Sequence, residues 1–308
     1  MVALTSTWHA GERAVQQRVG EAHLADRATG AIRTAVPPVA AEFLAQQHML
    51  AVAAVAEDGL VWASVLTGSP GFLTVPRDDV RDIAARPVAG DPLAAVLAQP
   101  ASIGALAIEP ATRRRSRFNG RSTPTPSGLH VQLDQVFANC PKYIQQREVV
   151  ALRPAEGDVG GRLDAQVGDR LSAHHRRWIE RADTFFIGTT DGEGGVDASH
   201  RGGNPGFVQV LGPDRFRFPD YRGNSMYMTL GNLQLQPAAG FVFVDWDTGA
   251  ALQVSGRAVV NFDVPDEARM PGALRVVDVA VTRVVELTRA VPLVWGEATP
   301  SRFNPDLA

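Results

Sequence analysis

Two short polar runs in the second half of the chain could together bind an anion. One is Ser199-His200-Arg201, which precedes Gly202-Gly203, and the other is Tyr221–Ser225, which precedes a stretch with a helical pattern. A phosphate needs hydroxyls, backbone N–H groups and one or two cations at one place, and the N–H groups at a helix start point outward. Each run alone could equally be a glycine turn with a solvated arginine. Both together predict an anion site, provided that the fold brings them side by side.

The chain repeats itself around these runs. Residues 59–75 and 194–210, aligned with a shift of 135, are identical at 9 of 17 positions, and residues 117–121 align with 253–257 at a shift of 136. This period is too long for a solenoid repeat and has the size of an ordinary domain. The sequence therefore predicts two copies of one domain, residues 1–155 and residues 156–308.

Both copies show the pattern of a small β-barrel. A helix is expected at Pro37–Gln47 in the first copy and at Leu171–Arg181 in the second, each followed by short apolar strands that are separated by turn residues. Ahead of them we expect a short helix near Glu12–Gly20 and an irregular segment at Ala22–Ile32. Many short antiparallel strands with few helices favour a mainly β fold over a parallel α/β sheet.

Composition limits the class of protein. The 308 residues are 45% hydrophobic and 20% charged, which is ordinary for a globular protein, and the net charge of −3 gives no reason to expect a nucleic-acid or membrane partner. No apolar run approaches the ~20 residues that span a bilayer, and no secretory signal is recognisable. The single cysteine, Cys140, excludes an internal disulfide, so we expect a cytoplasmic location. The histidines make no metal-ligand spacing with it, and we expect no metal site.

The sequence resembles the pyridoxamine-phosphate-oxidase-like, FMN-binding split-barrel proteins at Ser199–Gly206, Pro219–Ser225 and Gln253–Arg257, and NCPKYIQQR (139–147) resembles a motif that closes many of these barrels. It is most similar to a tandem branch of that superfamily. The resemblance implies two tandem split β-barrels, with a flavin whose phosphate and ribityl chain contact the run after the third strand. The cofactor-binding residues that it implies are Lys142, Ser199, His200, Arg201, Asp220, Tyr221, Arg222, Asn224, Ser225 and Gln253. Haem and deazaflavin are alternative cofactors.

The same resemblance implies a flavin-dependent oxidoreductase that acts at flavin N5 on an unidentified small molecule. Gly223-Asn224-Ser225 stands where the name-giving oxidase has Ser-Arg-Lys, so oxidation of pyridoxamine phosphate is not expected. No catalytic residue is assigned, and Tyr221 and His200 are the nearest titratable candidates. A separate flavin- or ferredoxin-type reductase and a homodimer are compatible with this interpretation. The alternatives are a flavin- or haem-binding storage or carrier protein without turnover, and a barrel without cofactor that acts as a scaffold.

The first copy differs at the corresponding places. Ser64-Val65-Leu66 aligns with Ser199-His200-Arg201, and the loop after Val75 has no recognisable counterpart of residues 219–225. A phosphate against Val65 and Leu66 would have no cation to pair with, which is costly for a buried charge. We therefore expect one cofactor site per chain, built on the second copy and completed by donors from the first, with Arg113–Arg121 and Lys142 as candidates.

Overall fold

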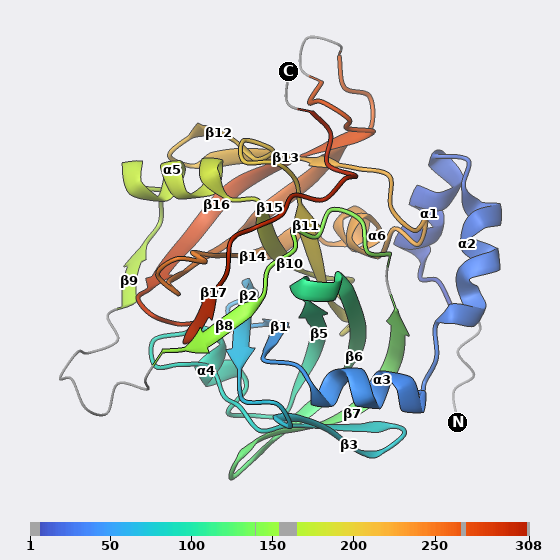
Figure 1. Cartoon of the computed structure of the whole chain (residues 1–308). Helices are drawn as coiled ribbons and strands as arrows, with labels where there is room; N and C mark the ends of the chain where they lie inside the picture. The colour runs from blue at the N-terminus through green and yellow to red at the C-terminus, as the bar shows by residue number, and fades with distance from the viewer. Residues whose placement is uncertain (1–6, 139, 154–164, 266–268, 307–308) are drawn as a thin grey trace.

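The computed structural model describes residues 7–138, 140–153, 165–265 and 269–306. These residues form two large antiparallel sheets, a two-stranded sheet and several short helices (Figure 1). The mainly β fold predicted from the sequence is confirmed. The predicted boundary between residues 155 and 156 lies outside the described residues. No helix in the described ranges is long and apolar enough to cross a membrane.

The two large sheets have the same strand order. The first runs β2 (Val61–Thr67), β1 (Met49–Val55), β5 (Ala101–Glu109), β6 (Arg114–Thr125), β7 (Gly128–Ala138), β4 (Val80–Ile83), β3 (Leu73–Arg77). The second runs β11 (Val196–Gly202), β10 (Thr184–Thr190), β14 (Ala238–Val244), β15 (Ala251–Asn261), β16 (Arg275–Leu287), β13 (Arg215–Asp220), β12 (Gln209–Gly212), with β9 (Ala165–Gly168) paired to β16. Identical order in two sheets confirms the predicted duplication.

The correspondence extends to single residues. Leu50 pairs with Leu66 in the first sheet, and Phe185 pairs with Arg201 in the second, so both partners shift by 135. The helices correspond at the same shift. α3 (Pro38–Ala45) precedes β1 as α5 (Ala173–Arg181) precedes β10, and α4 (Leu93–Val96) follows β4 as α6 (Met228–Leu235) follows β13.

One expectation about the first copy is wrong. Residues 84–92, which connect β4 to α4, stand where residues 219–227 stand in the second copy, and both loops contain a left-handed residue at the matching position, Gly90 and Ser225. The first copy therefore does have a counterpart of this loop. Sequence comparison does not reveal it because the two loops have different side chains, and their backbones also differ at the end, where Pro92 is right-handed and Tyr227 is left-handed.

The copies pack through strands that approach closely. β2 packs on β10, β14 and β15, and β11 packs on β5 and β6. Gly104 in β5 and its counterpart Gly240 in β14 permit this, because a Cβ at Gly104 would lie 2.4 Å from the Asp197 carbonyl carbon and one at Gly240 would lie 2.5 Å from the Val61 oxygen. Each copy thus presents side chains of its long central strand to the edge strand of the other.

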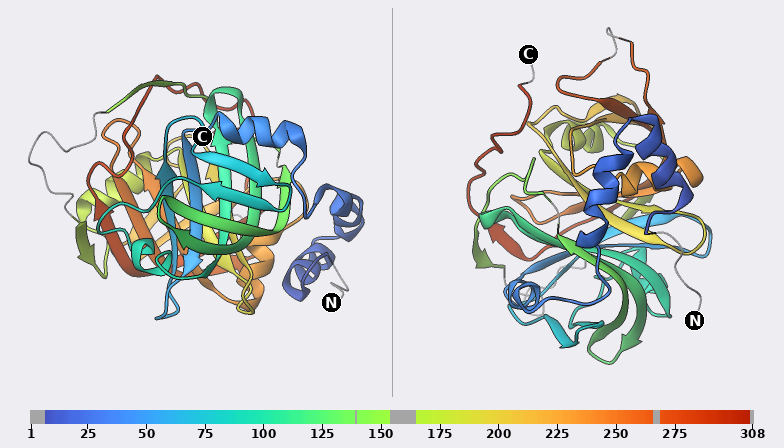
Figure 2. Two further views of the ribbon diagram at one scale, coloured as in Figure 1. Left: turned by 90° about the horizontal axis from the view of Figure 1, so that it is seen from below. Right: turned by 90° about the vertical axis from the view of Figure 1, so that its right-hand side faces the viewer.

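A helical arm, residues 7–31, precedes the first sheet in sequence but lies beside α6 of the second copy (Figures 1 and 2). It contains α1 (Ala10–Arg18), α2 (Ala22–Ala28) and the 3-10 turn η1 (Thr29–Ala31). The expected irregular segment at Ala22–Ile32 is therefore wrong, since most of it is helical. The remaining elements are the turn η2 (Pro110–Thr112) and the pair of β8 (Val149–Leu152) with β17 (Leu293–Trp295).

Candidate functional site

A pocket lies where the second copy meets β6 of the first. Its walls come from β11, the loop 219–227 and the start of α6, and from five residues of the first copy, Arg115, Arg117, Cys140, Lys142 and Tyr143. Eight of the ten residues predicted to bind a cofactor line it, namely Lys142, Ser199, His200, Arg201, Asp220, Tyr221, Asn224 and Ser225. The fold therefore brings together the two polar runs from which the anion site was predicted.

The other two predicted residues lie elsewhere. Arg222 is exposed and does not line the pocket, although its backbone oxygen accepts a hydrogen bond from the Tyr143 hydroxyl at 3.2 Å. Gln253 is fully buried at a separate place, where its Nε2 donates to the Ala63 oxygen at 2.9 Å and to Asp91 Oδ1 at 3.2 Å. The physical reason is that β15 faces the edge strand of the other copy, so Gln253 contacts β2 and not β11.

Within the predicted range Arg113–Arg121, two arginines reach the pocket. Arg115 and Arg117 lie on one face of β6, because alternate residues of a strand share a face. Arg115 donates to the Cys140 oxygen and contacts His200 Nδ1 at 3.3 Å. Arg113 and Arg114 point elsewhere, to the Ile144 oxygen and the Phe43 ring. The run of arginines itself does not single out this pair, because Arg113, Arg114 and Arg115 are consecutive; only the two-residue period of the strand separates Arg115 and Arg117 from Arg114.

The cations of the pocket are incompletely neutralised. Arg117 is paired with Asp197 at 2.6 Å, and Asp220 is paired with Arg275 at 2.8 Å. Among the described residues, neither Arg115 nor Arg201 forms an ion pair, and the Nε atoms of both have no hydrogen-bond partner. Burial, and then the charge of Arg201, lower the pKa of Arg115 to about 9. Both guanidiniums remain charged near neutral pH, so the pocket favours an anionic ligand.

His200 is a hydrogen-bond donor and a poor base. Burial, followed by the charges of Arg115, Arg201 and Arg147, holds the pKa of His200 well below its usual value. Because Arg115 donates to Nδ1, the proton of the neutral ring sits on Nε2, which has no partner among the described residues. Burial raises the pKa of Tyr221 to about 12. Neither of these two candidates titrates near pH 7.

Hydroxyl donors complete this wall. The Thr229 hydroxyl donates to Ser199 Oγ at 3.0 Å, which leaves the Ser199 hydrogen available for a ligand. Tyr143 and Tyr221, one from each copy, pack with ring centroids 4.9 Å apart. Cys140 also lines the pocket. No group of three or more His, Cys, Asp or Glu side chains in the described ranges could hold a metal ion.

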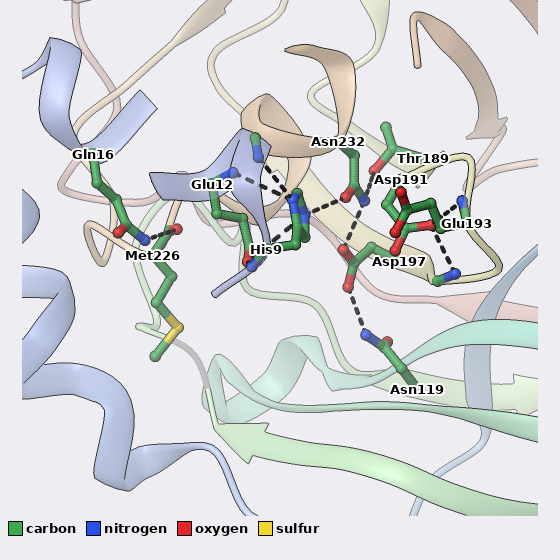
Figure 3. A network of polar contacts seen from close by, with 12 residues as sticks. His9, Glu12, Gln16, Asn119, Thr189, Asp191, Glu193, Asp197, Met226 and Asn232 are labelled. Atoms are coloured by element: carbon green, nitrogen blue, oxygen red, sulfur yellow. Dashed lines mark hydrogen bonds and ion pairs between the residues drawn. The ribbon is translucent and has the colours of Figure 1, made fainter. Parts of the chain in front are cut away.

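Behind the pocket lies a buried polar network (Figure 3). Asp197 accepts from Arg117, from Asn119 at 2.7 Å and from Asn232 Nδ2 at 2.8 Å. Asn232 in turn accepts from His9 Nε2 at 2.8 Å, because His9 Nδ1 caps the first turn of α1. The network therefore connects the N-terminal arm, the second copy and β6 of the first copy.

The first copy has a matching cluster that is closed. Ser64 corresponds to Ser199, and its hydroxyl donates to the carboxylate of Asp91, which also accepts from Gln253 and from the Leu93 backbone N–H at 2.8 Å. Ser64, Asp91 and Gln253 are all buried. Burial raises the pKa of Asp91. In this cluster an internal carboxylate takes the hydrogen bonds that a ligand would otherwise receive.

A family model of pyridoxamine 5'-phosphate oxidase matches residues 171–291. Solved structures with a likeness include HupZ of Group A Streptococcus, at 14% identity over 40% of this chain and 98% of that chain with a TM-score of 0.32. A candidate pyridoxamine 5'-phosphate oxidase of Lactobacillus delbrueckii shares 19% identity over 37% and 93%, with a TM-score of 0.30. An F420 reductase shares 15% over 34% and 90%, with a TM-score of 0.25. These structural likenesses are too weak to support an argument. No curated protein sequence matches the chain.

Proposed function

We propose that the chain is an FMN-dependent oxidoreductase that acts on a small molecule, in keeping with the match of residues 171–291 to the family model of pyridoxamine 5'-phosphate oxidase. The observation that carries the proposal is the convergence of Arg115 from the first copy and Arg201 from the second on one pocket. Neither forms an ion pair among the described residues, and burial lowers the pKa of Arg201, although the charge of Asp220 acts to raise it. Unpaired cations in a partly buried pocket are costly unless an anion joins them.

The donor set fits a phosphate monoester. Arg115 and Arg201 supply charge-assisted donors, Ser199 supplies a hydroxyl, and His200 supplies a neutral N–H. When bound, FMN supplies hydride or electron transfer at its N5. The side chains of the pocket bind and orient it, and the low pKa of His200 together with the high pKa of Tyr221 means that neither transfers a proton near neutral pH.

The absence of proton transfer by His200 and Tyr221 near neutral pH also suits the second candidate function, a flavin or haem carrier without turnover. The two candidates differ in the fate of the bound ligand. An enzyme is reduced by NAD(P)H or by a separate reductase and is then reoxidised by a substrate, whereas a carrier holds its ligand unchanged. The visible spectrum of the purified protein distinguishes flavin, deazaflavin and haem before either test.

The proposal predicts which arginines matter for binding. We expect Arg201→Met and Arg115→Met each to weaken FMN binding by roughly 1.5–3 kcal/mol, or about 10- to 150-fold, because each removes a charge-assisted hydrogen bond to phosphate. Arg222→Met is the matched control, since Arg222 lies in the same loop but outside the pocket. Titration monitored by quenching of flavin fluorescence measures all three. Unchanged affinity in both Arg115→Met and Arg201→Met would refute the proposed phosphate site.

A further inference from the structure

The loop 225–227 forms part of the pocket wall in a backbone conformation that its side chains do not favour. Ser225 and Tyr227 both have φ of 62°, in the left-handed region, and both line the pocket. Non-glycine residues adopt this region rarely, and they keep it only where surrounding contacts impose it. The contacts that impose it here should therefore also shape the pocket.

Those contacts come from the N-terminal arm. Glu21, the N-cap residue directly before α2, accepts from Ser225 Oγ and from the Tyr227 hydroxyl, each at 2.6 Å and each at the same oxygen, Oε2. The buried Gln16 donates through Nε2 to the Met226 oxygen at 3.1 Å. Each of the residues 225, 226 and 227 thus forms a hydrogen bond to the arm.

The electrostatics agree with this geometry. Burial acts to raise the pKa of Glu21, but the hydrogen bonds from Ser225 and Tyr227, together with the charges of Arg275 and Arg222, outweigh it, and the pKa is lowered overall. The two hydroxyls therefore bind the carboxylate in its charged form. The guanidinium of Arg275 lies over the Tyr227 ring, 5.1 Å from its centre, and is a second contact of this residue.

The arm is anchored to the same wall. Gly11 of α1 lies against Gly231 of α6, where a Cβ on Gly11 would meet the Gly231 oxygen at 2.2 Å. His9 and Glu12 continue this contact through the network behind the pocket (Figure 3). Since α6 begins at Met228, the arm holds both the helix and the loop that leads into it.

The first copy shows what happens without an arm. Its matching loop has Gly90 where the second copy has Ser225, with φ of 83°. Glycine adopts this region without steric cost, so no external clamp is needed. Asp91, at the next position, closes that cluster from within. The hydrogen bonds from the arm are therefore found at the loop 225–227, which carries non-glycine residues in the left-handed region and borders the pocket.

We propose that Glu21 is a positioning residue for the ligand site: it holds Ser225 and Tyr227 in place and so pre-shapes the wall beside Arg201. The inference rests on the proposed function, because it concerns the same pocket. It adds that the arm, which precedes the first sheet in sequence, helps to shape the ligand site on the second copy.

Three variants test this by FMN titration. We expect Glu21→Ala to bind FMN about tenfold more weakly, and Glu21→Gln about two- to threefold more weakly, because the amide oxygen can still accept both hydroxyls. Asp26→Ala is the matched control in the same helix, since the exposed Asp26 is paired with Arg13 of the arm and not with the loop. Adding Ser225→Gly to Glu21→Ala should recover part of the affinity, because glycine removes the strain that the carboxylate offsets.

A readout without ligand separates this inference from the proposed function. Amide hydrogen exchange should become faster at residues 224–230 in Glu21→Ala and stay unchanged at residues 84–92. If the wild-type chain does not bind FMN but this local change occurs, the proposed function fails and the positioning role stands. If exchange at 224–230 is unchanged in Glu21→Ala, or if Glu21→Ala binds FMN as wild type does, the positioning role is wrong.

Discussion

Ser199 borders a pocket lined by unpaired cations, whereas its counterpart Ser64 donates to Asp91 in a closed cluster. The strands around both serines have the same order and register. The difference lies in a few facing side chains. Arg117 of the first copy faces Asp197, while its counterpart Gln253 of the second copy faces Ala63 and Asp91. Duplication thus supplied two equivalent places, and charge distinguishes them.

A second comparison concerns the barrel interiors. The second copy is filled with phenylalanine rings, and Phe216 lies 5.2 Å from Phe241. At the same strand positions the first copy has Arg81 and Ala105. Arg81 is fully buried, its three nitrogens have no hydrogen-bond partner among the described residues, and burial lowers its pKa to about 10. The first copy, which has no open pocket, therefore also has a buried charge in its core at a position where the second copy has a phenylalanine ring.

The largest difference in stability between the Ser199 and Ser64 clusters should come from substituting Arg117 and its counterpart Gln253. We expect Arg117→Met to lower the free energy of unfolding by about 3–5 kcal/mol, because it leaves the buried Asp197 without its cation. Gln253→Leu should cost about 1–3 kcal/mol, since only neutral donors are lost. Urea denaturation measures both. Equal losses would mean that the two clusters do not differ in charge as described.

The next effect is the pH dependence of the free energy of unfolding, and it arises from Glu12 in the polar network behind the pocket. Burial, and then the charge of Asp197, raise the pKa of Glu12 from 4.5 to about 8. The folded state therefore holds a proton that the unfolded state has released, so stability from this group is complete below about pH 4.5 and is lost as pH rises to about 8. We expect a decline of a few kcal/mol across this range. In Glu12→Gln this part of the decline should vanish, and a wild-type pH profile in that variant would contradict the assignment.

A smaller effect, of opposite sign, is expected in the core of the first copy. Arg81→Met should raise the free energy of unfolding by about 1–3 kcal/mol, because it replaces a buried charge by an apolar side chain of similar size. Among the described residues this charge has no hydrogen-bond or ion-pair partner, and its guanidinium lies only over the Phe118 ring, 5.7 Å from the ring centre. Phe216→Met at the matching position should lower it by about 1 kcal/mol. Thermal denaturation of both variants checks the pair. A loss of stability in Arg81→Met would show that the guanidinium has a favourable role in this barrel.

The sequence predicted the duplication and most strands because aligned residues such as Gly71 and Gly206 keep the same turn, with φ of 95° in both copies. It also placed Ser199, Arg201 and Asn224 together. It misplaced Gln253, since a residue of a central strand contacts the other copy and a linear motif does not encode that pairing. Glu21 was missed for a related reason: its partners are about 200 residues away, in a segment without periodic apolar residues.

The central claim is that each chain has one cation-lined site, shared between the two copies. Titration of the purified wild-type chain with FMN, followed by flavin fluorescence, tests it most directly when Arg115→Met and Arg201→Met are run beside it. We expect one FMN per chain, with binding weakened in each variant although the two arginines belong to different copies. Two equivalent FMN molecules per chain, or a single one whose affinity neither variant changes, would contradict the claim.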